Sequence, residues 1–430
     1  MLDIQFIRDN PEKVKKGLTA KQFDSSLVDK VLELDGKRRD LIQEIEDLRA
    51  QRNEISSKEH AVNDKGKQLK EKLKNLEPEL KKIEEKYKQI LGKIPNVPAD
   101  DVKVGRDESE NEVIRKWGTP IKFNFRPKDH LEIGENLRII DVKKASGISG
   151  ARFNYLIGDA VFLEFALVNY VLDTLTNEKI LKNIANKLKL NYNSKPFIPV
   201  IPPVMIKPDV FEKMARKDPE EERYKLRDDE LFLVGSAEHT LGPLHMDETL
   251  TEDNFPLRYI GFSTSFRREA GSYGKDTRGI LRMHQFDKVE MESFTLPENG
   301  RLEQDFFVAI QEYLMQMLKI PYQVVGICTG DMGGPDYRQI DIDSWMPGQN
   351  KYRETHTSDY MTDYQSRRLN TKVRRKDATE FVHMNDATAF AIGRTIIAIL
   401  ENYQQKDGSV VIPEVLRKWM GKEKIVNIKI

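Results

Sequence analysis

The chain has 430 residues and a mass of 49.9 kDa, enough for two or three domains of ordinary size. Hydrophobic residues make up 39% and charged residues 33%, against about 45–50% and about 25% in typical globular chains, so we expect part of the chain to be a long solvated helix. Lys plus Arg and Asp plus Glu number 70 each, and this zero net charge excludes a protein that binds nucleic acid through an overall positive charge.

The chain has one cysteine, Cys328. It therefore cannot form a disulfide framework or a cysteine-based zinc site within one chain, and we expect no zinc and a reducing compartment. No apolar run approaches the ~18 residues of a membrane span, and the N-terminal residues lack the apolar stretch of a signal peptide. These features predict a soluble, cytoplasmic protein with no membrane partner.

Two stretches near the N-terminus carry apolar residues at alternating four- and three-residue steps, the pattern of a coiled coil. The first contains Leu27, Val31, Leu34, Leu41, Ile45, Leu48 and Ile55, and the second contains Leu69, Leu73, Leu76, Leu80, Ile83, Tyr87 and Ile90. A polar break at 56–67 separates them. We predict an antiparallel helical coiled-coil hairpin over about 27–93, inside an N-terminal domain of residues 1–94. Pro78 should kink the second arm or remove a backbone hydrogen bond from it.

Amino-acid composition alone does not decide the function of this hairpin. Its second arm, 61–93, has ten Lys and six Asp or Glu residues. The hairpin could be a spacer or dimerisation coiled coil with solvated charges, or an arm whose basic side contacts a phosphate backbone. The following segment, 95–120, is rich in Pro, Gly and acidic residues, so we expect a linker there and a second domain over 121–430.

The second domain mixes helical and strand patterns without strict alternation. We predict helices at 159–176, 303–318 and 387–403, and strands at 197–205, 259–266, 286–296 and 322–328. Neighbouring strands can pair through short loops. This order favours an α+β fold on a mostly antiparallel sheet flanked by helices over a doubly wound parallel fold.

The sequence lacks a Walker phosphate loop, a GxGxxG fingerprint, an HExxH motif and a GxSxG elbow. The segment 266–290 is unusual, because it combines two predicted strands with a Gly-rich basic loop. Arg267 and Glu269 are two residues apart, and Arg282, Phe286 and Glu290 are spaced by four, so each set should share one strand face. The alternative is a surface ladder of salt bridges.

Three further clusters carry polar groups. Glu354 and Thr357 offer oxygen atoms that suit Mg²⁺, although a polar loop over 345–368 explains them equally well. Arg394 interrupts an apolar helical pattern and either extends to solvent or faces an anion. Small hydroxyl groups lie beside a carboxylate at 235–240, where a lone histidine is more often structural than catalytic.

These motifs together resemble the seryl-tRNA synthetase family of class II aminoacyl-tRNA synthetases. Residues 266–290, which include the sequence GSYGKDTRG…RMHQFDKVE, resemble motif 2. Residues 383–403 resemble motif 3, and the segment around Pro202-Pro203 resembles motif 1, which builds the dimer interface in class II enzymes. Ser236-Ala237-Glu238 stands where the family has Thr-x-Glu, and the hairpin and linker also correspond, so the resemblance covers nearly the whole chain.

The resemblance implies a serine–tRNA ligase. Such an enzyme activates L-serine with ATP to seryl-adenylate, releases pyrophosphate, and transfers serine to the 3′ end of tRNA(Ser), and also of tRNA(Sec). It further implies Mg²⁺ as cofactor and a homodimer. The hairpin would grip the long variable arm of the tRNA, and the 271–279 loop would meet its acceptor end.

The resemblance also implies roles for individual residues. Arg267 would bind the α-phosphate, Glu269 the adenine amino group and Arg394 the γ-phosphate, and these three form the expected catalytic set. The expected ATP-binding residues are Arg267, Arg268, Glu269, Met283, Phe286, Glu354, Thr355, His356, Thr357 and Arg394, with Phe286 stacking on adenine and Glu354 and Thr357 holding Mg²⁺. The expected serine-binding residues are Ser236, Ala237, Glu238, Arg267, Glu290 and Thr388.

The chain departs from the family pattern in two places. Asp386-Ala387-Thr388 replaces the Asn-Gly-Ser that is usual in bacterial members, and His356 to Tyr360 replace Ser-Ser-Cys-Ser-Asn. We expect Thr388 to supply the serine-binding hydroxyl and Asp386 to pair with a nearby cation.

The implied chemistry agrees with the residue types. A substrate carboxylate is already ionised, so its attack on phosphorus needs placement and charge neutralisation rather than a general base. Two other functions remain as alternatives. An amino acid:carrier-protein ligase would lack the long hairpin, and a non-catalytic nucleic-acid-binding or scaffolding relative would have lost Arg267, Glu269 or Arg394.

Overall fold

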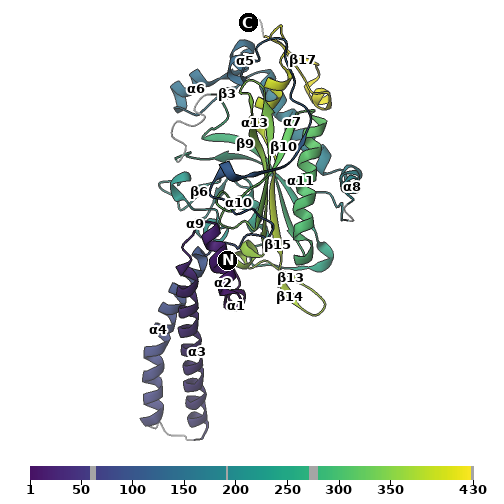
Figure 1. Ribbon diagram of the computed structural model, residues 1–430. Coiled ribbons are helices and arrows are strands. Elements are labelled where there is room, and N and C mark those ends of the chain that lie inside the picture. Colours follow the sequence, from purple (N-terminus) through teal and green to yellow (C-terminus); the bar gives the residue numbers. More distant parts are fainter. Residues whose placement is uncertain (59–63, 190–191, 271–278, 428–430) are drawn as a thin grey trace. The chain divides into compact units, whose positions relative to one another are not determined.

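The structure is a computed structural model that describes residues 1–58, 64–189, 192–270 and 279–427 (Figure 1). The chain divides into two compact units, Met1–Pro98 and Ala99–Ile430. Among the described residues, no helix combines the length and the apolar character that crossing a membrane requires.

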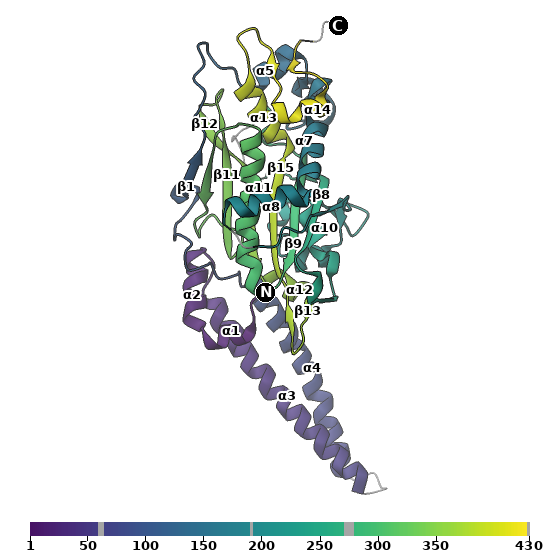
Figure 2. The same cartoon turned by 90° about the vertical axis from the view of Figure 1, so that its right-hand side faces the viewer.

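The N-terminal unit consists of four helices, of which two long ones form a hairpin. Helices α1 (Ile4–Asp9) and α2 (Pro11–Ala20) precede α3 (Ser26–Lys58) and α4 (Asp64–Lys93), which run side by side in opposite directions (Figures 1 and 2). Four residues of the predicted seam, Ile45, Leu48, Leu69 and Leu73, are buried together between them. The predicted coiled-coil hairpin is therefore confirmed.

Helix α4 continues through Pro78. Proline has no backbone N–H, so the carbonyl of Lys74 cannot receive the usual helical hydrogen bond. Both residues are exposed, and water can bind that carbonyl in place of the missing donor. The proline is tolerated because it lies on the solvent side of the arm, away from the buried seam.

The C-terminal unit is built on an eight-stranded sheet. Its order is β1-β10-β11-β12-β15-β9-β8-β4, and the neighbouring strands are antiparallel except for the parallel pair β4 and β8. The strands are β1 (Glu112–Trp117), β4 (Ile198–Val200), β8 (Leu257–Phe266), β9 (Gln285–Thr295), β10 (Tyr322–Gly326), β11 (Arg338–Met346), β12 (Lys351–Thr362) and β15 (His383–Ala391). The α+β fold on a mostly antiparallel sheet is confirmed.

Three helices, α7 (Asp159–Leu175), α11 (Gly300–Met317) and α13 (Ile392–Tyr403), cover one face of this sheet (Figures 1 and 2). The main apolar core lies between them and the sheet, and it takes alternate residues of central strands, such as Val289 and Met291 of β9. The residues between these face the other side of the sheet. That second face is where polar side chains gather.

Shorter elements complete the unit. They are α5 (His130–Leu137), α6 (Val142–Ser149), α8 (Glu178–Lys187), α9 (Pro208–Lys213), α10 (Glu238–Leu241), α12 (Tyr364–Leu369), α14 (Arg417–Met420), β2 (Ile140–Asp141), β3 (Tyr155–Leu156), β5 (Met205–Ile206), β6 (Phe232–Leu233), β7 (Thr249–Thr251), β13 (Lys372–Arg374), β14 (Thr379–Phe381), β16 (Val410–Val411) and β17 (Lys424–Ile425).

The sequence-based expectations need correction in three segments. The expected linker 95–120 contains β1, which pairs with β10. Its sequence EVIRKW includes Val113, Ile114 and Trp117, but these do not alternate with polar residues and they lie in a Pro-, Gly- and acid-rich stretch, so the strand was missed. Residues 387–391 end strand β15 instead of starting the helix, because their place between β12 and β9 overrides helical propensity. The polar stretch 345–368 is mostly strand β12 and helix α12, not a loop.

Candidate active site

A pocket of about 320 Å³ opens on the polar face of the sheet. Its walls come from β9, β11, β12, β15, the start of α13 and the segments around Arg216, Glu238 and Arg267. Ten residues expected from the sequence line it: Glu238, Arg267, Glu269, Met283, Phe286, Glu354, Thr355, Thr357, Thr388 and Arg394. Residues far apart in the chain are thus brought together as the resemblance to the family implied.

Strand β9 supplies the middle of the pocket through simple alternation. Its pairing with β8 is regular, without a bulge, so Phe286, Lys288 and Glu290 all face the same side. Arg282, Phe286 and Glu290 were expected on one strand face. The structure confirms this for Phe286 and Glu290, but Arg282 precedes β9 and is not part of the strand. Lys288 was missed, although the same even spacing predicts it.

The Phe286 end of the pocket presents a guanidinium beside an aromatic ring. Strand β8 ends at Phe266, so Arg267 follows the strand instead of belonging to it. Its Nε donates a hydrogen bond to the Gly235 carbonyl over 3.1 Å, and its guanidinium carbon lies 5.4 Å from the Phe286 ring centre. Glu269 has a left-handed backbone (φ 51°), and its carboxylate accepts a 3.3 Å hydrogen bond from Arg282.

A β-bulge places Glu354 and Thr357 on the same side of β12. These residues are three apart, so a regular strand would point them in opposite directions. In the structure Glu354 pairs with Asp343 and His356 with Ile342, which leaves Thr355 as the extra residue of a bulge. The bulge shifts the alternation by one, and both side chains reach the pocket.

Arg394, at the start of α13, contacts the carboxylate of Glu354. Its Nη1 donates to the Glu354 carbonyl (2.9 Å) and to its Oε1 (2.8 Å). Partial desolvation in the pocket would raise the pKa of the half-exposed Glu354, but the Arg394 guanidinium, with Arg267 and Lys288, holds that pKa below its ordinary value. Glu354 is therefore ionised at neutral pH.

The oxygen atoms around Glu354 fit a divalent cation. Asp341 lies opposite Thr357 in the β11–β12 pairing, and Asp341 lines the pocket together with Glu354. Burial and the neighbouring Glu354 raise the pKa of Asp341 well above its ordinary value, because two carboxylates without a cation repel each other. Carboxylate and hydroxyl oxygens are the ligands that Mg²⁺ prefers, so the residues present fit this ion.

At the other end of the pocket, a buried lysine joins a hydroxyl and two carboxylates. Lys288 Nζ donates to Ser236 Oγ (3.0 Å) and lies 2.6 Å from Glu290 Oε2 and 3.7 Å from Glu238 Oε2. Thr388 is the direct neighbour of Glu290 across the β9–β15 pairing. Hydroxyl and carboxylate groups therefore converge on one small volume.

The two carboxyl groups beside Lys288 have different pKa values. Burial raises the pKa of Glu290 to about 8, and Lys288 offsets this only in part. Burial would also raise the pKa of Glu238, but Lys288 and Arg216 hold it well below its ordinary value. A neutral Glu290 can donate one hydrogen bond, whereas the ionised Glu238 only accepts.

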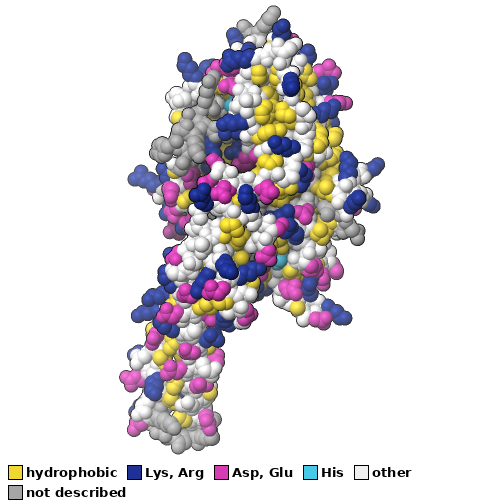
Figure 3. All heavy atoms as spheres, viewed as in Figure 1, with side chains coloured by type: hydrophobic (Ala, Val, Ile, Leu, Met, Phe, Trp, Pro, Cys, Tyr) yellow, Lys and Arg dark blue, Asp and Glu magenta, His cyan; other side chains and the backbone are white. Residues whose placement is uncertain are grey.

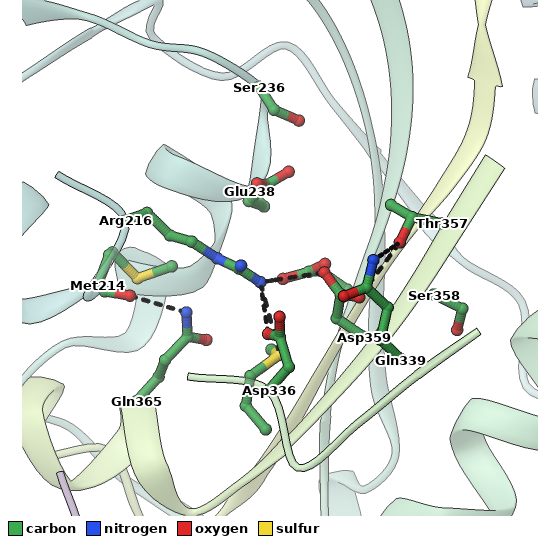
Figure 4. A network of polar contacts seen from close by, with 12 residues as sticks. Met214, Arg216, Ser236, Glu238, Asp336, Gln339, Thr357, Ser358, Asp359 and Gln365 are labelled. Atoms are coloured by element: carbon green, nitrogen blue, oxygen red, sulfur yellow. Dashed lines mark hydrogen bonds and ion pairs between the residues drawn. The ribbon is translucent and has the colours of Figure 1, made fainter. Parts of the chain in front are cut away.

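Arg216 binds three aspartates under this end of the pocket (Figure 4). Its Nη2 lies 3.1 Å from Asp336, 3.2 Å from Asp359 and 3.2 Å from Asp386. The expectation that Asp386 pairs with a nearby cation is confirmed. Arg216 itself was missed, because it follows α9 in a segment without any motif, and only the fold brings it to β12 and β15.

Five expected site residues do not line the pocket itself. Ser236 and Glu290 lie beside it, in contact with Lys288, and the other three lie elsewhere. Arg268 is exposed and lies on an outer surface beside Tyr224, because consecutive residues of an extended segment point in opposite directions. Ala237 packs in an apolar cluster. His356 is fully buried, and its Nδ1 lies 2.8 Å from Thr355 Oγ1 on the other side of the bulge. Residues 271–278 of the expected acceptor-end loop lie outside the described residues.

Comparison with known proteins gives matches along the whole chain. The family described as "Seryl-tRNA synthetase N-terminal domain" matches residues 1–98, and "tRNA synthetase class II core domain (G, H, P, S and T)" matches residues 223–403. A serine–tRNA ligase of Thermodesulfovibrio yellowstonii is 40% identical over 98% of this chain and 99% of its own length. One of Petrotoga mobilis is 38% identical over 98% and 99%.

Solved structures agree with these matches. The seryl-tRNA synthetase of Pyrococcus horikoshii, crystallised with ATP, is 37% identical, covers 100% of both chains and superposes with a TM-score of 0.91. The cytoplasmic serine–tRNA ligase of Naegleria fowleri, crystallised with AMP, is 30% identical, covers 99% of both chains and superposes with a TM-score of 0.86. The matches in sequence and in fold thus agree, and the chain belongs to the seryl-tRNA synthetase family of class II aminoacyl-tRNA synthetases.

Proposed function

We propose that this chain is a serine–tRNA ligase that forms seryl-adenylate from L-serine and ATP and then transfers the seryl group to tRNA(Ser). The observation that carries the proposal is one pocket with two chemically different ends. One end presents Arg267, Phe286 and Arg394, which suit a nucleotide triphosphate. The other presents Glu238, the hydroxyl of Thr388 and their buried neighbours, which suit a small amino acid with a hydroxyl group.

At the nucleotide end, each group has a role that its chemistry supports. The Phe286 ring offers a flat face on which adenine can stack, and Glu269 can accept a hydrogen bond from the adenine amino group. Arg267 offers a planar guanidinium fork to the α-phosphate. Arg394 exchanges its contact with Glu354 for the γ-phosphate.

The reaction is the attack of the serine carboxylate on the α-phosphorus, with pyrophosphate as the leaving group. The nucleophile is already ionised, so no general base is required. The chain's contribution is to hold the two reactants in line and to neutralise charge that builds up on the phosphate, which is the role of Arg267. Glu354 and Thr357, with Asp341 beside them, would hold Mg²⁺, which neutralises further phosphate charge when bound.

Selection of serine follows from the polar groups at the other end. Ser236, Glu290 and Thr388 offer donors and acceptors to a substrate hydroxyl, and an analogue without the hydroxyl leaves buried polar groups unpaired. Sites of this kind reject such analogues by as much as ~10⁴–10⁵. Replacing Thr388 with alanine should raise the KM for serine, and an unchanged KM would contradict its place in the pocket.

We assign the hairpin of α3 and α4 to the long variable arm of tRNA(Ser). Lys and Arg side chains line both arms between acidic ones (Figure 3), and the excess of Lys over acidic residues lies on the second arm. Such an arm gains affinity by neutralising phosphates. The 271–279 loop is assigned to the acceptor end. A tRNA(Sec) with the same long arm would be charged as well.

We also propose a homodimer that works in the cytoplasm. On helix α7, Phe162 and Phe165 are 59% and 54% exposed, and Ile201, beside Pro202-Pro203, is 87% exposed. Large apolar side chains rarely stay in water together unless a partner covers them. Ile201 belongs to the segment that resembles motif 1, and Phe162 and Phe165 lie on the helix that precedes it.

The proposed function is tested by ATP–pyrophosphate exchange with serine, threonine, alanine and cysteine, followed by aminoacylation of tRNA(Ser) and tRNA(Sec). We expect exchange with serine at least ~10²-fold above the others and charging of tRNA(Ser). Exchange without tRNA charging would favour the carrier-protein ligase. The absence of exchange with any amino acid would favour the non-catalytic relative.

A further inference from the structure

The amino-acid end of the pocket contains a third carboxylate besides Glu238 and Glu290. One carboxylate oxygen each of Glu238, Glu290 and Asp386 lies within 4.8 Å of the other two. All three residues are at least nine-tenths buried. Three buried carboxyl groups that converge on one point form a site for a cationic group, because each offers an acceptor oxygen and a nearby cation favours the ionised form.

Two oxygen atoms of this triplet have no hydrogen-bond donor among the described residues. They are Glu238 Oε2 and Glu290 Oε1. Buried acceptors are nearly always satisfied in folded proteins, so a missing donor points to a ligand. Lys288 Nζ lies 2.6 Å from the other carboxylate oxygen of Glu290, Oε2, and 3.7 Å from Glu238 Oε2, which is beyond hydrogen-bond distance.

Asp386 is held in place from below by Arg216. The guanidinium Nη2 contacts Asp386 at 3.2 Å and also bridges Asp336 and Asp359, which come from other segments. The backbone carries Arg216 there through Ala215, whose φ is 55°, and the Arg216 carbonyl accepts a 2.7 Å hydrogen bond from Arg223. The arginine thus fixes the position of Asp386 from a well-anchored segment.

We propose that Asp386 is a third ligand of the α-ammonium group of the amino-acid substrate, and that Arg216 is the positioning residue for it. An ammonium has three N–H donors, and Glu238, Glu290 and Asp386 offer one acceptor oxygen each. Arg216 pairs with Asp386 but is shared with Asp336 and Asp359, and Lys288 is shared by Glu290 and Glu238, so a further positive charge is favoured there. This inference rests on the proposed function, because it concerns the same pocket.

The test compares Asp386→Asn with the unchanged full-length protein. The substitution keeps the shape of the side chain and removes one charge. We expect the KM for serine in ATP–pyrophosphate exchange to rise about tenfold or more, while the KM for ATP and the thermal midpoint stay unchanged. Titration of serine into the protein without ATP should show the same loss of affinity, and this measurement does not depend on catalysis.

L-Alanine separates the ammonium from the hydroxyl. It carries the ammonium but lacks the hydroxyl, and it should inhibit the exchange weakly. If Asp386 binds the ammonium, the inhibition constant of alanine rises by the same factor as the KM for serine. A change for serine without a change for alanine would assign Asp386 to the hydroxyl and overturn the proposal, as would a change of less than about twofold for serine.

Arg216→Lys tests the positioning role, because lysine keeps the charge but is shorter and lacks the guanidinium whose Nη2 contacts all three aspartates. We expect a higher KM for serine in this variant and no further increase when Asp386→Asn is added. Additive effects would show that Arg216 acts by some other route. A wild-type chain that binds or activates no serine would instead contradict the proposed function itself.

Discussion

Two adjacent arginines provide a direct test of the site, because both were expected to bind ATP but the structure places only Arg267 in the pocket. Arg267 is half-buried in the pocket, 5.4 Å from the Phe286 ring, whereas Arg268 is exposed on the outer surface. We predict that Arg267→Ala lowers kcat/KM for ATP–pyrophosphate exchange strongly. Arg268→Ala should lower it by less than about threefold, as for an exposed side chain away from the reacting groups.

The size of the effect follows from the contacts that the guanidinium can make. A charge-assisted hydrogen bond contributes about 1.5–3 kcal/mol, and a guanidinium fork can make two to a phosphate. Because Arg267 is only half-buried, we take the lower end, about 3 kcal/mol, which corresponds to about 10²-fold at 1.36 kcal/mol per tenfold. Thermal unfolding of both variants controls for folding. Equal losses in the two variants, or an undiminished rate in Arg267→Ala, would refute the assignment of Arg267 to the α-phosphate.

Three further predictions concern stability and the floor of the pocket. Arg258 and Glu303 are fully buried and joined by two hydrogen bonds of 2.7 and 2.8 Å. Arg258→Met leaves the Glu303 charge buried without its partner, so it should lower the free energy of unfolding by about 3–5 kcal/mol in urea titrations. Adding Glu303→Leu should restore part of this loss, and no recovery would contradict the role of the unpaired charge. Burial lowers the pKa of His383 to about 4, so the unfolded chain binds this proton below pH ~6.5 and the folded one only below about 4. The free energy of unfolding should therefore fall by up to about 3 kcal/mol as the pH drops through that window, and a slope that is the same in His383→Gln would be evidence against this cause. Finally, a Cβ added at Gly333 would lie 2.3 Å from Asp336 Oδ2, so Gly333→Ala should displace the Asp336 carboxylate that pairs with Arg216. We expect a higher KM for serine and an unchanged KM for ATP. An unchanged KM for serine would show that the Arg216 cluster tolerates the shift.

Much of the architecture was readable from local patterns. The heptad spacing predicted both arms of the hairpin, and α7, α11, β8 and β9 begin and end within a few residues of the predicted segments. These elements have strong periodicity, and burial in the structure reinforces the same pattern. The predictions for strand β1 and for the end of β15 were wrong, because neither segment has apolar residues at a regular spacing.

The residues of the pocket likewise fall into those that the sequence predicted and those that it did not. The motifs identified Arg267, Phe286 and Arg394, because each lies in a long segment whose sequence is specific to the family. Even spacing along β9 also predicted that Phe286 and Glu290 share a face. His356 and Arg268 were misplaced, because the bulge at Thr355 and the end of β8 change which side chains face the pocket.

The sequence by itself determined the family, the helical hairpin and the chemical kinds of group at the active site, because these depend on residue types at short, fixed spacings. Only the tertiary structure decided that Arg216 reaches Asp336, Asp359 and Asp386, which lie 120 to 170 residues further along the chain. Such a cluster is set by strand order and by the path of one irregular segment after α9. No local pattern of residues encodes either of these.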